Sequence, residues 1–547
     1  MSQFDFANGQ QRHQELHGHE KMGVSKTSDH IDNQLHIEAD TEACWKFLSR
    51  PYMPEEDMVY LHRKGAFKLP VRNLMLALLT SYCNWVHPQL PVLNLQQFLD
   101  TVVCNDGKNV SPLLFQAVMY AGVAHLEERV LRLHGCPSRY EFQETLLTRA
   151  KLLHDFKSEP DVFTVAQATL LMSINHECSR TSTIWLAHSH LAAQKLGLES
   201  PGAYLLMGVE QSKLCIRLWW SIYIRDNTLR LEIGSPQLLQ DVHYHAPRLS
   251  LDCFDLSPFS TTIQCSLSEA PFLQNLEIHR MLMQIAIERT GLVCQLSQIL
   301  ALRNRMSDFP RVRPDGPAYY LAQALRRWES ELEPGLRFES KSSQVFEYHC
   351  GILSLLYLST FNALLQTRFQ PQSCDMRLDA IRSNVEHNNG KALDIARTLY
   401  LSGSRIPPTL GMGMVYNAVS LSITLAKWLG PSLAEPLRLD SAILCLCALV
   451  ESQPRGTAVE IALCRLGSRI QGLLTESGGK VKGTKRRGRD KIAVALDIAR
   501  EIDAEEQNIS AGSVERGPLE NRAVSPSLDT LFDWTISSDG SFPPQNK

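Results

Sequence analysis

The sequence has almost no excess of charge of either sign. Its 547 residues contain 55 lysines and arginines against 58 aspartates and glutamates, so the net charge is −3 and the isoelectric point is about 6.7. A chain with this balance has no global attraction to nucleic acid. The hydrophobic content of 44% and charged content of 21% predict a soluble globular protein, and exclude a fibrous or wholly disordered one.

The fourteen cysteines lack the spacing of a metal cluster. Cys44 and Cys83 are the first two and lie far apart, while Cys445 and Cys447 stand two residues apart in a predicted helix, where their thiols diverge. A six-cysteine cluster for two zinc ions needs cysteines two and about six residues apart. The sequence thus predicts no zinc cluster. Since Met1–Phe6 has neither a basic start nor an apolar core, we expect free thiols in the cytosol or nucleus.

Motifs of enzymes and metal sites are also scarce. There is no Gly-x-Ser-x-Gly elbow, no P-loop and no dinucleotide fingerprint after a strand. His188 and His190 lie in a predicted helix, where side chains two residues apart diverge by about 200°. His243 and His245 would face one side of an extended segment, but no further ligands of recognisable spacing accompany them. We therefore predict no enzyme, no catalytic residue, no metal and no cofactor.

No clean membrane span is present. The most apolar segment, residues 410–429, is near the length that a span needs. Insertion would leave Asn417 and Lys427 without partners in lipid, which is costly. A buried core helix is the favoured interpretation, and we predict no membrane association.

What the sequence does contain is helical patterning with clear start and stop signals. Asn94, Ser111 and Asp161 each precede an apolar pattern of helical spacing and are good N-caps, and Gly197 ends another such pattern. After a loop that follows Pro247, further helices are expected over residues 276–306, 319–332, 348–368, 377–401, 410–429, 441–450 and 457–474. No convincing strand alternation appears. The predicted fold is all-α, with a polar disordered tail over 1–40, a helical body over 41–475, and a basic linker and acidic/aromatic tail over 476–547.

The central helix of this body is predicted over residues 217–233. Its two adjacent tryptophans, Trp219 and Trp220, point about 100° apart, so both can be buried only if the helix is enclosed. Tyr223 continues the stripe of Trp219. We expect all three side chains to be buried. The helix should stop at Gly234, with Pro236 preventing its continuation.

Four charged residues of the same helix need partners. An unpaired buried charge is costly, so each should be paired or held at the rim of the core. They are Arg217, Arg225, Asp226 and Arg230.

Four pieces of the chain, taken in order, resemble a known family. They are Tyr60–Pro70, Tyr82–Pro91, Trp185–Leu198 and the stretch from Arg217 to Pro236. The last resembles the signature of the fungal-specific transcription factor domain, the middle homology region of fungal zinc-cluster regulators, and the first two look like its cutinase-regulator branch. The resemblance spans roughly residues 45–250. It departs from the family where His243 and His245 replace common acidic residues. The resemblance implies a structural role for the positions of the family signature. These are Arg217, Trp219, Trp220, Tyr223, Arg225, Asp226, Gly234 and Pro236.

The resemblance implies a nuclear regulator of transcription, with a metabolic gene cluster as one kind of target. Because no zinc cluster is found, it implies either a DNA-binding partner or a homo- or heterodimer within the family, together with the transcription machinery and a small-molecule inducer. Two explanations of the missing cluster stay open: loss in evolution, or omission from the sequence as read. Two other functions also stay open, a non-DNA-binding co-regulator or scaffold, and a pathway enzyme on an unfamiliar helical fold.

Two linear segments near the C-terminus carry a mechanism. Exposed cations on flexible backbone can bind an import receptor, and the candidates are Lys485, Arg486, Arg487 and Arg489. The alternative is a solvated linker or a nonspecific phosphate contact. An activation segment that folds on a coactivator would use interleaved acidic and apolar residues, here Leu531, Phe532, Asp533 and Trp534. The alternative is a tail whose tryptophan is incidental or tucks back onto the body.

Overall fold

A computed structural model of the chain describes residues 38–39, 48–104, 110–136, 138–174, 179–233, 238, 246–308, 315–338, 343–367 and 376–401. Within these ranges the fold is all-α, as predicted, with two strands of two residues each. The α-helices are α3 (Glu55–Arg63), α4 (Arg72–Ser81), α5 (Leu95–Leu99), α6 (Pro112–Val123), α7 (Glu128–Leu133), α8 (Arg139–Asp155), α9 (Val162–Met172), α10 (Ser179–Lys195), α11 (Pro201–Leu205), α12 (Val209–Ile233), α13 (Thr261–Ser266), α14 (Pro271–Gln274), α15 (Leu276–Asp308), α16 (Asp315–Glu331), α17 (Gln344–Thr367) and α18 (Met376–Leu401).

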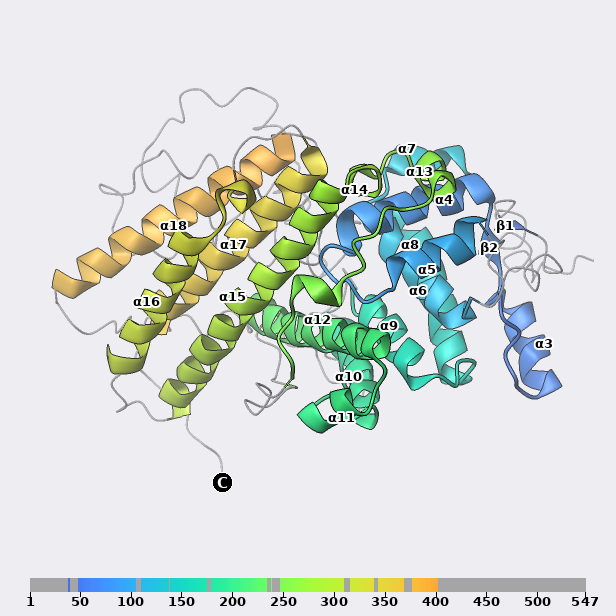
Figure 1. Cartoon of the computed structure of the whole chain (residues 1–547), viewed down its shortest axis with the longest axis horizontal. Helices are drawn as coiled ribbons and strands as arrows, with labels where there is room; N and C mark the ends of the chain where they lie inside the picture. Colours follow the sequence, from blue (N-terminus) through green and yellow to red (C-terminus); the bar gives the residue numbers. More distant parts are fainter. Residues whose placement is uncertain are drawn as a thin grey trace, which may run out of the picture.

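The helices form two groups that α12 joins (Figure 1). In the first group α6 packs against α4, α8 and α9, and α9 packs against α10. In the second group α17 lies between α15, α16 and α18. Helix α12 packs against α9 and α10 on one side and against α15 on the other. The helix predicted to be central therefore connects both parts of the core.

The predicted helix boundaries are confirmed by cap geometry. The Ser111 hydroxyl accepts a hydrogen bond from the Leu114 amide at 3.3 Å, with Pro112 as the first residue of α6. The Asp161 carboxylate accepts from two amides at the start of α9, and the Asn94 side chain accepts from one at the start of α5. Gly197 has φ +71°, the left-handed conformation that ends a helix and favours glycine.

Three local features differ from the prediction. Helices α4 and α5 run on into π-helical turns, η1 (Tyr82–Val86) and η2 (Asp100–Cys104). The stretch after Pro247, predicted as loop, contains η3 (Leu251–Cys253), α13 and α14. Strands β1 (Glu38–Ala39) and β2 (Leu69–Pro70) pair antiparallel. Periodicity cannot reveal such elements, because two to six residues span less than two turns of helix or a few residues of strand.

Close packing of α4 on α6 depends on a glycine. The Ser81 hydroxyl donates to the carbonyl of Gly122 at 2.7 Å. A Cβ placed on Gly122 would stand 2.5 Å from the backbone oxygen of Leu78, closer than real Cβ contacts allow. The two helix backbones can therefore approach this closely only because position 122 has no side chain.

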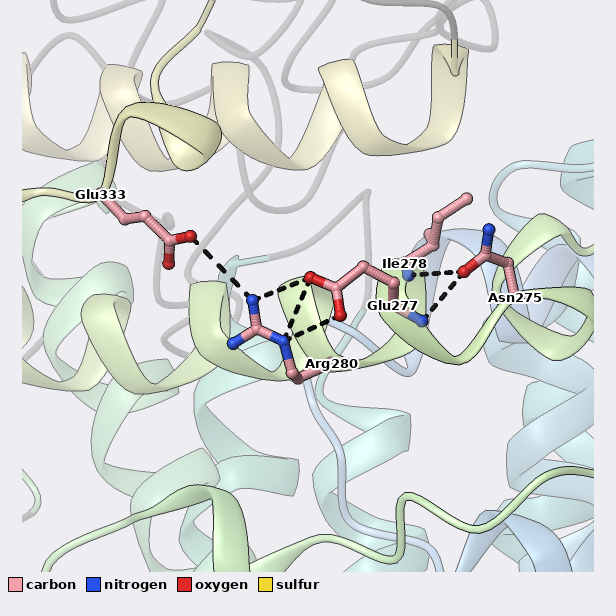
Figure 2. A network of polar contacts seen from close by, with 5 residues as sticks. All are labelled: Asn275, Glu277, Ile278, Arg280 and Glu333. Atoms are coloured by element: carbon pink, nitrogen blue, oxygen red, sulfur yellow. Dashed lines mark hydrogen bonds and ion pairs between the residues drawn. The ribbon is translucent and has the colours of Figure 1, made fainter.

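The start of α15 is fixed by a small polar network (Figure 2). The Asn275 side chain accepts from the amides of Glu277 and Ile278 at 2.9 and 3.2 Å, as an N-cap does. Arg280 donates to both carboxylate oxygens of Glu277 and approaches Glu333 at 4.0 Å, next to η4 (Pro334–Leu336). The network ties the turn after α16 to the first turn of α15.

By length and composition alone, two of the described helices could cross a membrane. They are residues 276–305 of α15 and Gln344–Thr367 of α17. Their most apolar windows are 61% and 89% buried inside the protein, which is the pattern of core helices. The segment 410–429, the predicted core helix, lies outside the described residues, as does everything after 401.

Candidate functional site

The aromatic residues of the signature helix α12 are buried, as predicted. Trp219, Trp220 and Tyr223 are 0%, 5% and 4% exposed. The Trp220 Nε1–H donates to the carbonyl of Pro247 at 2.8 Å, and its ring meets Tyr223 edge-on at 5.5 Å between centroids. A buried tryptophan that keeps its hydrogen bond stabilises the core through its apolar area, and the hydrogen bond fixes the orientation of its ring. These residues hold the helix between the two groups.

Of the two placements predicted for the charged residues of α12, the structure shows burial with partners. None stands at the rim: Arg217, Arg225, Asp226 and Arg230 are all buried. Backbone and amide groups can satisfy a guanidinium in the core, and Arg230 Nη1 donates to the Asn227 side-chain oxygen at 3.0 Å. The expectation that these charges are paired or held at the rim is confirmed by pairing for Arg225, Asp226 and Arg230.

Arg225 and Asp226 each fasten a neighbouring segment. Arg225 Nη2 donates to the carbonyl of Ser173 at 2.9 Å, at the C-cap of α9, where the helix dipole favours a cation. Asp226 Oδ1 accepts from the amide of Leu238 at 3.3 Å. Two signature charges thus orient α9 and the chain beyond α12.

Arg217 lies against an aromatic ring. Its guanidinium carbon is 5.6 Å from the centroid of the Phe254 ring, a cation–π arrangement. Burial lowers the pKa of Arg217 to about 10, so the group stays charged at neutral pH. It links α12 to the residues after η3.

The remaining signature positions lie at or beyond the end of the helix. Helix α12 ends at Ile233, directly before Gly234, as predicted. Gly234 and Pro236 themselves are outside the described residues. So are both linear candidates, the import residues Lys485, Arg486, Arg487 and Arg489 and the activation residues Leu531, Phe532, Asp533 and Trp534.

A second set of buried polar contacts holds the turn after α4. His349, on α17, donates from Nε2 to the carbonyl of Asn84 at 2.7 Å and accepts at Nδ1 from the Gln89 amide at 2.8 Å. Because a carbonyl can only accept, Nε2 carries the proton and Nδ1 is free to accept. Burial lowers the pKa of His349 to about 3, so the ring is neutral.

Arg289, on α15, holds the same turn. Its Nη1 donates to the carbonyl of Gln89 at 3.0 Å and approaches that of Pro88 at 3.5 Å. The residue is 3% exposed, and burial lowers its pKa to about 10. The turn of residues 84–89 is therefore clamped by one imidazole and one guanidinium, from two different helices.

Aromatic rings surround this clamp. Trp85 stacks on His125 at 5.7 Å between centroids and meets Tyr348 edge-on at 5.0 Å. Trp85 and His125 are half-buried, whereas Tyr348 is fully buried. The rings run from the partly exposed Trp85 inward to α17.

The sequence prediction did not single out Arg289 or His349. Arg289 had a visible signal, since it lies on the helical stripe of Leu282, Ile285 and Leu296, which are all fully buried. A charge on an otherwise apolar stripe indicates a core position with a special role. His349 had no such signal, because its partners lie 260 residues and more away in the chain.

The histidine pairs do not converge where they are described. His190 Nε2 contacts the carboxylate of Glu199 at 3.1 Å, whereas the ring of His188 faces His154 and Trp185. The predicted divergence on the helix is confirmed. His243 and His245 lie outside the described residues, and among those described no three potential ligands are grouped to hold a metal ion.

Comparison with known proteins shows that part of the chain is similar to a known family. Residues 79–312 match the fungal specific transcription factor domain. The chain is 28% identical to cutinase transcription factor 1 beta of Fusarium vanettenii over 265 residues, 48% of the chain and 30% of that protein. It is 28% identical to transcription factor cpaR of Aspergillus oryzae over 400 residues, 66% of each. It is 27% identical to the fusaric acid cluster transcription factor FUB12 of Fusarium oxysporum f. sp. lycopersici, over 36% of the chain and 30% of that protein.

No solved structure matches the chain. The chain spans between about a third and two thirds of the length of these curated relatives. The matched region runs from the end of α4 to just beyond the last residue of α15 and includes all of α12, where the sequence resemblance was strongest. Residues 79–312 of this chain therefore form a fungal-specific transcription factor domain.

Proposed function

We propose that this protein is a fungal transcriptional regulator that acts through its fungal-specific transcription factor domain. The observation that carries the proposal is the match of residues 79–312, supported by relatives that are themselves named transcription factors. One relative is named for the fusaric acid cluster. A pathway-specific regulator of a metabolic gene cluster, located in the nucleus, is the corresponding role for this chain.

The proposed regulator does not contact DNA through a zinc cluster within these 547 residues. No cysteine spacing in the sequence fits such a cluster. The cysteines of the helical core are poor ligands as well, because burial raises the pKa of Cys83 and raises the pKa of Cys215 and Cys294 to about 11. A cysteine binds zinc as its thiolate. We infer that DNA is read by a partner, either a DNA-binding protein or a family member in a homo- or heterodimer.

A tethering experiment tests the regulator role. The full chain is fused to an unrelated DNA-binding module in a fungal host, and a reporter downstream of that module's site is measured. We expect reporter output to change at least several-fold against the module alone. Removal of residues 528–536, which contain Leu531, Phe532, Asp533 and Trp534, should reduce an activating effect. Unchanged output in every growth condition, with the fusion in the nucleus, would refute the role.

Localisation tests the import segment separately. Replacing Lys485, Arg486, Arg487 and Arg489 with alanine should shift a tagged protein to the cytoplasm. A matched control replaces four exposed basic residues of the helical body, namely Arg63, Arg129, Lys151 and Lys195. This control should stay nuclear. Equal nuclear signal in both variants would instead mean that a partner carries the protein in.

A further inference from the structure

Arg289 has more hydrogen-bond donors than the described protein uses. Its Nη1 is occupied by the carbonyls of Pro88 and Gln89, but Nε and Nη2 have no partner. No carboxylate among the described residues pairs with it. A buried cation without a counter-ion costs several kcal/mol, so an anion bound at this position would be stabilising.

The two unused nitrogens form one recognition edge. In the planar guanidinium, Nε–H and one N–H of Nη2 point in parallel along one edge of the group, and Nη1 lies away from that edge. Two parallel donors at this spacing match the two oxygens of a carboxylate, which they bind in a bidentate manner. The carbonyls that hold Nη1 fix the plane, so the free edge is oriented in advance.

A third donor comes from α17, the helix that packs against α15. Tyr348 is completely buried, and its hydroxyl has no hydrogen-bond partner among the residues that the structure describes. Tyr348 directly precedes His349, which contacts the same turn that Arg289 holds, and the Tyr348 ring meets Trp85 of that turn edge-on. Burial raises the pKa of Tyr348 well above its ordinary value, so it remains an O–H donor. A guanidinium edge and a hydroxyl together offer donors and positive charge, and a water molecule could satisfy the donors but not the charge.

The surroundings of these donors suit an organic group. Trp85 meets Tyr348 edge-on and stacks on His125, and both Trp85 and His125 are partly exposed. Trp85 also lies in the π-helical turn η1, a kind of turn often found at functional sites. The aromatic rings would contact the apolar part of a ligand whose charged end points inward.

We propose that Arg289 and Tyr348 bind the carboxylate of a small organic acid, with Trp85 and His125 against its apolar part. This names the effector class for the regulator proposed above, and it rests on that proposal only for its biological consequence. Because Arg289 and Tyr348 belong to α15 and α17, a bound acid would join these helices to the turn of residues 84–89.

Binding to the purified full chain tests the proposal. The probes are sodium acetate, hexanoate and benzoate, each titrated calorimetrically and in a thermal-shift assay against sodium chloride of equal ionic strength. Benzamide, which has the shape of benzoate without the charge, is the matched control ligand, and sodium phosphate tests for an inorganic anion. We expect saturable binding of benzoate or hexanoate, weaker binding of acetate, and none of benzamide.

Two variants locate the site. Tyr348→Phe removes one donor without changing the packing, and should weaken carboxylate binding by about tenfold, the equivalent of one hydrogen bond to a charged group. Arg289→Gln should abolish binding. The control Tyr82→Phe removes the unpartnered hydroxyl of another fully buried tyrosine and should leave binding within about twofold. If Arg289→Gln does not fold, Tyr348→Phe with its control decides alone.

Several results would overturn the assignment. They are no saturable binding of any of the three acids up to about 10 mM, equal binding of benzoate and benzamide, saturation by phosphate alone, or unchanged affinity in Tyr348→Phe. A protein that binds the acids but fails the reporter test would contradict only the regulator role. A protein that passes the reporter test but does not bind the acids would contradict only the ligand site.

Discussion

Replacement of Gly122 by alanine is a direct test of how α4 packs on α6. Alanine is normally the better residue in a helix, by about 1 kcal/mol over glycine. At this position the new methyl carbon would lie 2.5 Å from the carbonyl oxygen of Leu78, a backbone atom that no rotamer can move. An ordinary carbon–oxygen contact is about 3.3 Å or more, so the helices must separate or rotate by most of an ångström.

The magnitude follows from competing effects. Overpacking a core in this way costs about 1–3 kcal/mol. Separation of the helices would also weaken the 2.7 Å hydrogen bond from Ser81 to the Gly122 carbonyl, worth about 1 kcal/mol. Together these exceed the gain in helix propensity. We expect Gly122→Ala to destabilise the protein by about 1–3 kcal/mol.

The same replacement of glycine by alanine at two other positions should give different changes in stability. Gly291 is exposed within α15, with no atom within 4 Å of an added Cβ. Gly291→Ala should therefore stabilise the fold by about 0.5–1 kcal/mol. Gly351 would meet the terminal carbons of Leu399 at 2.9 and 3.2 Å, which a rotamer change can partly relieve, so Gly351→Ala should fall between the two.

Urea unfolding of the three variants, followed by helical circular dichroism, measures this order. The free energy of unfolding is compared at constant slope with denaturant, since a changed slope would signal a different unfolding transition. Wild-type stability or better in Gly122→Ala, with Gly291→Ala behaving as expected, would refute the close approach of α4 and α6.

Three further predictions concern the core, pH and DNA. Trp220→Ala should cost about 3–5 kcal/mol of stability, because a buried indole and its bond to Pro247 are lost; a folded variant of wild-type stability would contradict the burial. Since the pKa of His349 is lowered to about 3 in the folded protein, the unfolded chain binds the extra proton below about pH 6.5, and stability should fall as pH falls from there toward 3. The slope from this group is at most about 1.4 kcal/mol per pH unit, and His349→Gln should remove it from the pH dependence of unfolding. The purified chain should bind no specific duplex at physiological salt, and any residual binding through residues 480–491 should lack sequence preference and weaken steeply with added salt; a zinc-dependent footprint would contradict this.

Local signals in the sequence were sufficient for the helices and their ends. Ser111, Asp161 and Gly197 define boundaries through bonds that reach at most a few residues along the chain, so their chemistry can be read in isolation. The burial of Trp219 and Trp220 was predictable for a similar reason, since two adjacent indoles on a helix leave no exposed arrangement without a large apolar surface.

The partners of buried charges were not predictable in this way. Arg225 donates to the carbonyl of Ser173, and Arg289 donates from Nη1 to that of Gln89, and backbone oxygens carry no side-chain signature in the sequence. The clamp by His349 likewise depends on which helices meet in space. Periodicity shows that a charge faces the core, but only the tertiary arrangement shows what it meets there.

The separation of the clamp in sequence has a consequence for how the chain matures. His349 is 260 residues from Gln89, and on a ribosome adding about 5–20 residues per second that interval lasts roughly 10–50 seconds. During synthesis the turn at residues 84–89 therefore emerges long before α17, the helix that holds it. Until α17 is made, Trp85 of the turn lacks its contact with Tyr348. The matched region ends at residue 312, short of α17, so a fragment cut at that boundary would lack both His349 and Tyr348. Chaperone dependence should thus be greatest for nascent chains between about 90 and 350 residues, and a fragment intended to fold alone should extend at least through α17.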